Sequence, residues 1–104
     1  MPKLTIAVKQ FKTKEGKAFF KATCKGKYIP SVDVDDETYY TIKLHSPKVN
    51  GKSESLDTPT REGFYELKVP SRRDMWLDQR EDMLGKNIFH VRASKIVRVD
   101  DLEK

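Results

Sequence analysis

The stretch that decides the fold is residues 1–27, which read MPKLTIAVKQFKTKEGKAFFKATCKGK. Two sets of apolar residues alternate with polar ones there: Leu4, Ile6 and Val8, then Ala18, Phe20, Ala22 and Cys24. Alternation with a period of two is typical of half-buried strands. The segment 13–17 between the two sets suits a three-residue hairpin loop with Gly16 in the left-handed conformation. The sequence therefore predicts a β-hairpin with one apolar face.

The opposite face of this hairpin is basic and aromatic. The loop sets a register that pairs Phe11 with Phe19, Lys9 with Lys21, Thr5 with Lys25, and Lys3 with Lys27. Like charges directly opposite each other destabilise an isolated sheet. A face of lysines and rings is better suited to a polyanion with flat groups, and single-stranded nucleic acid is such a ligand. The alternative is a solvated face whose lysines protect the sheet from aggregation.

Length and charge point in the same direction. A chain of 104 residues predicts one domain with a modest core. The net charge is +5, and residues 1–27 hold eight lysines against one glutamate, so the rest of the chain is net negative. Basic charge gathered on one hairpin indicates a nucleic-acid footprint better than a high isoelectric point alone does.

Three features bear on the compartment. No stretch approaches the roughly 18 apolar residues that cross a membrane, and the N-terminus lacks a signal pattern. Cys24 is the single cysteine, which excludes an internal disulfide framework. We expect a cytoplasmic protein with no membrane partner. Its thin core leaves room for a homodimer as a source of buried surface.

A third strand is expected over residues 38–45. Its inward residues are Tyr40, Ile42 and Leu44, and its outward residues are Tyr39, Thr41, Lys43 and His45. If this strand adjoins the hairpin, Tyr39 extends the aromatic and basic face. The polar residues 46–62 follow, either as a flexible loop or as a β-arm that carries Lys48 and Lys52 beside an Asn50-Gly51 turn.

The last third of the chain predicts two further strands and one helix. A fourth strand over residues 64–69 ends at Pro70. Residues 71–84 indicate a short helix with Ser71 as its N-cap, Gly85 as its C-terminal cap and Trp76 packed in the core. A final strand begins near Asn87, and residues 95–99 continue or follow it.

The sequence offers few residues that could support catalysis or bind a metal ion. His45 and His90 are the only histidines, and neither has a nearby nucleophile. Residues 33, 35 and 37 are acidic with the spacing of a calcium loop, but Thr38 stands where that loop needs glycine. No glycine-rich phosphate loop is present. We expect a protein that is not an enzyme and uses no metal or cofactor.

Five strands, a short helix and an aromatic, basic strand face resemble the OB-fold single-stranded DNA-binding proteins of phages and plasmids. The likeness is strongest in the hairpin over 11–19 and in the glycine-to-strand junction over 85–91. The resemblance implies a mostly β fold, a five-stranded OB-like barrel with one short helix before the last strand, as a single domain over 1–104. One departure is the helix, which follows the fourth strand rather than the third. One strand is therefore an addition, or residues 64–69 belong to an arm, or the barrel is of another kind.

The OB pattern places ligand across the second and third strands. Here it implies Phe19, Lys21, Lys25, Tyr39 and Lys43, with Lys9 and Phe11 alongside. The hairpin face adds Lys3 and Lys27, and the arm adds Lys48 and Lys52. The expected function is binding of single-stranded DNA, or RNA, with little sequence preference, in replication or recombination. The alternative is a small interaction protein, such as a phage-type inhibitor or adaptor, that places the basic hairpin on an acidic partner.

Overall fold

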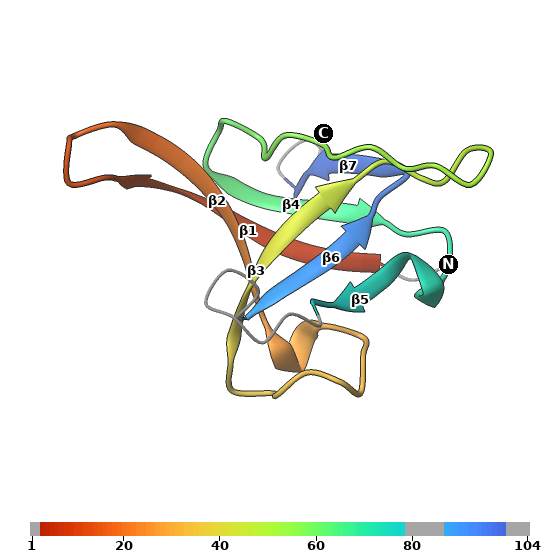
Figure 1. The fold of residues 1–104 in the computed structure, drawn as a ribbon. Helices are drawn as coiled ribbons and strands as arrows, with labels where there is room; N and C mark the ends of the chain where they lie inside the picture. The colour runs from red at the N-terminus through yellow and green to blue at the C-terminus, as the bar shows by residue number, and fades with distance from the viewer. Residues whose placement is uncertain (1–2, 79–86, 100–104) are drawn as a thin grey trace.

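The computed structural model describes residues 3–78 and 87–99, and this part of the chain is mostly β (Figure 1). Its seven strands form one sheet in the order β5-β6-β3-β2-β1-β4-β7. Their bounds are Lys3–Lys12 (β1), Ala18–Lys25 (β2), Tyr39–His45 (β3), Gly63–Lys68 (β4), Met75–Leu77 (β5), Ile88–Arg92 (β6) and Lys95–Arg98 (β7). Two short 3-10 turns, η1 (Gly26–Tyr28) and η2 (Arg72–Asp74), lie between strands. No helix in the described ranges is long and apolar enough to cross a membrane.

The hairpin of β1 and β2 has the predicted register. Val8 lies opposite Ala22, and Phe11 lies opposite Phe19. Gly16 adopts a φ of +84°, and its amide donates to the carbonyl of Thr13 at 3.0 Å. The left-handed turn that the sequence predicted is therefore confirmed. The far end of this hairpin extends well beyond the rest of the molecule (Figure 1).

The two pairs predicted at the base of the hairpin are wrong. The β1–β2 ladder ends where Ala7 faces Thr23, and β1 then pairs on its other edge with β4. Lys3 consequently lies opposite Lys68 rather than Lys27. Lys27 is not in a strand, because β2 ends at Lys25 and the chain turns into η1. The cause is long-range pairing, which the alternation within one hairpin does not encode.

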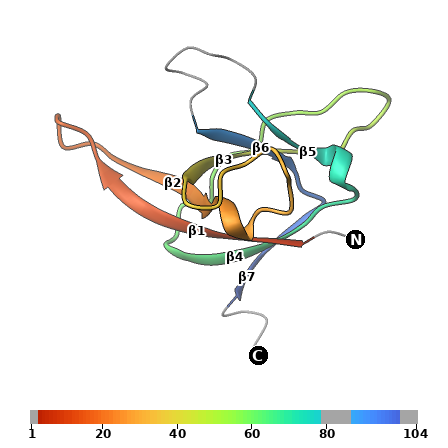
Figure 2. The same ribbon diagram turned by 90° about the horizontal axis from the view of Figure 1, so that it is seen from below.

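The sheet coils strongly along its strand order (Figure 2). Although β6 and β7 lie towards opposite ends of the strand order, only Ala93 and Ser94 separate them. Ala93 donates its amide to His45 of β3 at 2.9 Å, and Ser94 donates its amide to Lys68 of β4 at 2.8 Å. The expected closed set of five strands is thus corrected to a coiled sheet of seven described strands that is not closed. Residues 64–69 are not an arm, because β4 pairs with both β1 and β7.

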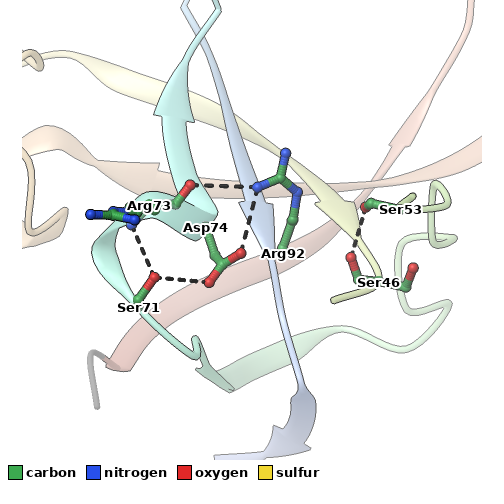
Figure 3. Close-up of polar contacts among 6 residues, drawn as sticks. All are labelled: Ser46, Ser53, Ser71, Arg73, Asp74 and Arg92. Atoms are coloured by element: carbon green, nitrogen blue, oxygen red, sulfur yellow. Dashed lines mark hydrogen bonds and ion pairs between the residues drawn. The ribbon is translucent and has the colours of Figure 1, made fainter. Parts of the chain in front are cut away.

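The helix predicted over residues 71–84 is wrong in its described part. Ser71 does accept the amide of Arg73 at 3.3 Å, and its hydroxyl donates to Asp74 at 3.1 Å, but the turn is η2 (Figure 3). Met75–Leu77 then forms β5, antiparallel to β6. Arg92 of β6 bonds both Asp74 and the carbonyl of Arg73, so contacts with β6 override the local helix pattern. Residues 79–86, with the predicted cap Gly85, lie outside the described residues.

The inward-facing residues of the strands form the core. The buried side chains include most of those predicted from alternation: Leu4, Ile6, Val8, Ala22, Cys24, Tyr40, Ile42, Leu44, Tyr65, Leu67 and Val69. Ala18, predicted on the apolar face of the hairpin, is exposed. Phe89 and Val91 of β6 and Met75 of β5 complete it. Phe20 is only partly buried, because the hairpin leaves the sheet near that position.

Residues 46–56 fold back as a narrow arm after β3. Asn50 and Gly51 have φ angles of 53° and 78°, as a type I′ hairpin turn requires. Val49 and Lys52 exchange backbone hydrogen bonds of 2.8 and 3.0 Å across this turn. At the base of the arm, the Ser53 hydroxyl donates to the carbonyl of Ser46 at 2.7 Å (Figure 3).

Candidate nucleic-acid interface

A groove of about 700 Å³ lies on the outer face of the sheet. Alternate residues of β1 share this face, since every second side chain of a strand points the same way. The groove is lined by Lys3, Thr5, Ala7, Lys9, Thr23, Cys24, Lys25, Tyr28, Tyr39 and Phe64. Four elements besides β1 therefore contribute to it: β2, η1, β3 and β4.

Three exposed aromatic rings border the groove. Tyr28, Tyr39 and Phe64 are 64%, 66% and 62% exposed, respectively. The ammonium of Lys25 lies 5.7 Å from the centre of the Tyr39 ring, and that of Lys27 lies 5.1 Å from the Tyr28 ring. Rings beside cations can stack on bases while the ammonium groups contact phosphates. Lys27, displaced from the strand where it was predicted, thus lies beside a ring that lines the groove.

Two of the groove lysines make ion pairs at the surface. Lys3 contacts Glu66 at 3.6 Å, and Lys25 contacts Glu37 at 3.4 Å. Surface pairs of this kind contribute little free energy, about 0–1 kcal/mol. A phosphate group can therefore compete for both ammonium groups at low cost.

Phe11 and Phe19 stack on each other farther along the hairpin. Their ring centres are 5.8 Å apart, with an angle of 25° between the planes. Both are exposed, at 40% and 43%, which agrees with their predicted outward placement. They do not line the groove, because the hairpin has left the rest of the sheet at this point.

Five predicted site lysines do not line the groove. One of them, Lys27, lies beside the Tyr28 ring at its border. Lys21 faces Lys9 across the hairpin and is half-buried. Lys43 lies opposite His90 of β6, two strands away from β1. Lys48 and Lys52 are on the arm over 46–56. The structure therefore brings Lys3, Lys9, Lys25 and Tyr39 together in the groove. It leaves Lys21, Lys43, Lys48 and Lys52 apart from it.

Tyr28 and Phe64 were not among the predicted site residues. Phe64 alternates with the buried residues Tyr65 and Leu67, so its outward direction could be read from the sequence. Its position in the groove depends on the pairing with Ala7, which brings β4 beside β1. Tyr28 follows the end of β2, and no local pattern assigns it to a site.

A second cluster joins β3, β5 and β6. Nε2 of His45 lies 2.9 Å from Nδ1 of His90, and Nε2 of His90 lies 2.8 Å from the Asp78 carboxylate. The Trp76 ring stacks on His90 with centres 5.1 Å apart, and the Arg92 guanidinium lies 4.4 Å from the Trp76 ring centre. Trp76 is therefore half-buried in this cluster, not in the core as predicted. Parallel pairing of β3 with β6 brings together two histidines that are distant in sequence.

Two side chains, His45 and Cys24, have pKa values shifted towards their uncharged forms. Burial, followed by electrostatic interactions with His90 and Arg92, lowers the pKa of His45. Burial also raises the pKa of the Cys24 thiol to about 11, so it is protonated near neutral pH and a poor nucleophile. In residues 3–78 and 87–99, no three His, Cys, Asp or Glu side chains are grouped as metal ligands.

No protein-family model, curated protein or solved structure matches this chain. The chemistry of the groove is therefore the basis on which its ligand is argued.

Proposed function

We propose that this protein binds single-stranded DNA, or RNA, in the groove with little sequence preference. The observation that carries the proposal is the meeting of three lysines and three exposed rings in one groove: Lys3, Lys9, Lys25, Tyr28, Tyr39 and Phe64. Lysines neutralise phosphates whatever the sequence. Rings stack on every base, because each base has a π face.

A single strand fits this chemistry better than a duplex. In a duplex the base faces are stacked on each other, so exposed rings such as Tyr39 and Phe64 have nothing to contact. In a single strand the bases can unstack and lie on the protein rings while the backbone follows the lysines. Such binding serves processes that expose single strands, and we place the protein in replication or recombination.

The arrangement of strands supports the proposal by analogy. We take β6 and β7 as one interrupted strand, which with β1 to β4 gives the five strands of a partly open, OB-like barrel, and β5 as an addition. That fold binds nucleic acid across its second and third strands. Here Thr23 and Lys25 of β2 and Tyr39 of β3 line the groove.

A titration with matched single-stranded DNA, single-stranded RNA and duplex DNA tests this function. Tyr28 and Tyr39 serve as intrinsic probes, and poly(dT) should quench their fluorescence on binding. We expect tight binding of single strands and weaker binding of the duplex at the same salt concentration. Equal affinity for all three ligands would contradict a stacking mode, and no binding at all would reject the function.

The second candidate is an interaction module for an acidic protein. It is favoured by the projecting hairpin, where β4 pairs with β1 only as far as Val8 and β3 pairs with β2 only from Thr23. Both outer edges of the hairpin can therefore accept an added strand, beside the exposed Phe11 and Phe19. Poly(dT) separates the candidates, since a protein-interaction module does not need the groove rings.

A further inference from the structure

Three lysines lie side by side across three adjacent strands. Lys3 of β1 faces Lys68 of β4, and Lys68 faces Lys95 of β7. All three side chains are exposed. Neighbouring strands are about 4.8 Å apart, so this lysine row extends roughly 10 Å from the groove.

Within residues 3–78 and 87–99, one salt bridge neutralises part of the row. The next residues on the same face are Thr5, Glu66 and Val97, which face one another across the same three strands. Glu66 supplies one carboxylate, and it contacts Lys3 at 3.6 Å. Three like charges in direct opposition destabilise a sheet. An anion bound along the row would relieve that repulsion.

The row also continues the groove. Lys3 belongs to both, since it lines the groove and begins the row. The groove follows β1 from Lys9 to Lys3, whereas the row crosses the strands from Lys3 to Lys95. None of Thr5, Glu66 and Val97 can stack on a base. The chemistry beside the row is therefore suited to phosphate alone.

We infer that the lysine row is a second, phosphate-only segment of the nucleic-acid track. This inference rests on the proposed function: a strand whose bases stack in the groove turns at Lys3 and lays its backbone across β4 and β7. The ligand that fills both segments is longer than the one that fills the groove. Lys68 and Lys95 then add affinity only for the longer ligand.

The test is Lys68→Ala with Lys95→Ala in one variant, titrated with short and long dT oligonucleotides. One OB-type domain occupies roughly 4–16 nucleotides, so lengths of about 6 and about 15 bracket the track. We expect the variant to bind the short oligonucleotide as the parent does and to lose the added affinity for the long one. Its log–log salt slope for the long ligand should be shallower by about 1.4, since each phosphate contact with a single strand contributes about 0.7.

A charge-conserving variant, Lys68→Arg with Lys95→Arg, is the matched control and should keep the slope of the parent. Circular dichroism and size-exclusion chromatography show whether each variant keeps its fold and its oligomeric state. An alanine variant that binds the long oligonucleotide as the parent does would overturn the inference and leave the groove function intact. Self-association of that variant with unchanged binding would assign the lysines to edge protection instead. A parent that binds neither oligonucleotide would reject the groove function itself.

Discussion

At the scale of single residues, Gly26 lies against the backbone of another segment. A β-carbon at this position would lie 1.9 Å from the carbonyl oxygen of Asp35 and 2.7 Å from its carbon. Because both atoms belong to the backbone, they cannot move aside cheaply. We expect Gly26→Ala to lower the free energy of unfolding by about 1–3 kcal/mol, the usual cost of overpacking. Urea denaturation measures it, and an unchanged midpoint would show that the segment over 31–37 moves freely.

Phe64 and Tyr65 are neighbours in the chain with opposite expected roles. Phe64 is exposed beside the groove, so Phe64→Ala should cost little stability and weaken oligonucleotide binding roughly 5- to 150-fold, since stacking contributes about 1–3 kcal/mol. Tyr65 is buried and donates its hydroxyl to the Arg61 carbonyl at 2.7 Å. Tyr65→Ala should therefore lower stability by about 3–5 kcal/mol. Fluorescence titration and urea unfolding of both variants measure these effects. Loss of stability in Phe64→Ala together with a stable Tyr65→Ala variant would contradict the assignment.

His45 makes stability depend on pH. Burial first, and then electrostatic interactions with His90 and Arg92, lower its pKa in the folded protein from 6.5. Below pH 6.5 the unfolded chain therefore binds a proton on His45 more readily than the folded protein does. The stability that the folded state gains from neutral His45 is complete above pH 6.5 and is lost as the pH falls towards the folded pKa. His45→Gln should flatten the loss of stability between about pH 7.5 and about pH 5. Urea midpoints at both pH values check this, and an equal loss in parent and variant would assign the effect to other groups.

At the scale of elements, the arm over 46–56 has its internal hydrogen bonds at its turn and at its base. Beyond the turn at Asn50 and Gly51, it is joined to the sheet near Ser46 and by the amide of Leu56, which donates to Leu44. An isolated two-stranded hairpin is marginally stable in water. Amides of Val49 and Lys52 should thus exchange with solvent faster than that of Ile42 in β3. Hydrogen exchange measures this, and equal protection would mean that the arm is as stable as the sheet.

The same experiment with a long oligonucleotide tests the predicted role of Lys48 and Lys52. If these lysines contact the ligand, arm amides should exchange more slowly when it is added. Unchanged exchange would remove both residues from the interface.

The elements also show what a sequence can predict. Alternation is local, so the inward residues of β1, β2, β3 and β4 and the outward direction of Lys9 and Tyr39 could be predicted from it. Pairing between distant segments is not local. Because of such pairing, the partner of Lys3 is Lys68 and not Lys27, and Trp76 lies on a strand beside β6 instead of in a helix. Phe64 and Tyr28 were missed for the same reason, because only the assembled sheet brings them to the groove.

At the scale of the whole molecule, basic charge is concentrated in residues 1–27 and the rest of the chain is net negative. We expect binding to weaken steeply with salt. If five lysines each contact one phosphate (Lys3, Lys9, Lys25, Lys68 and Lys95), the log–log slope for a long single strand is about −3.5. Titrations over a range of salt concentrations measure it. A slope near zero would contradict the electrostatic part of the mechanism.

The short link of Ala93 and Ser94 between β6 and β7 has a consequence for biosynthesis. One edge of β3 and one edge of β4 stay unpaired until this late part of the chain is made, since β6 pairs with β3 and β7 pairs with β4. A nascent chain that has emerged only as far as β4 lacks the strands that pair with the outer edges of β3 and β4. Contacts between residues so distant in sequence slow folding and leave unpaired edges exposed while translation continues. We therefore expect the unpaired edges of β3 and β4 to be open to aggregation until residues 88–98 have left the ribosome.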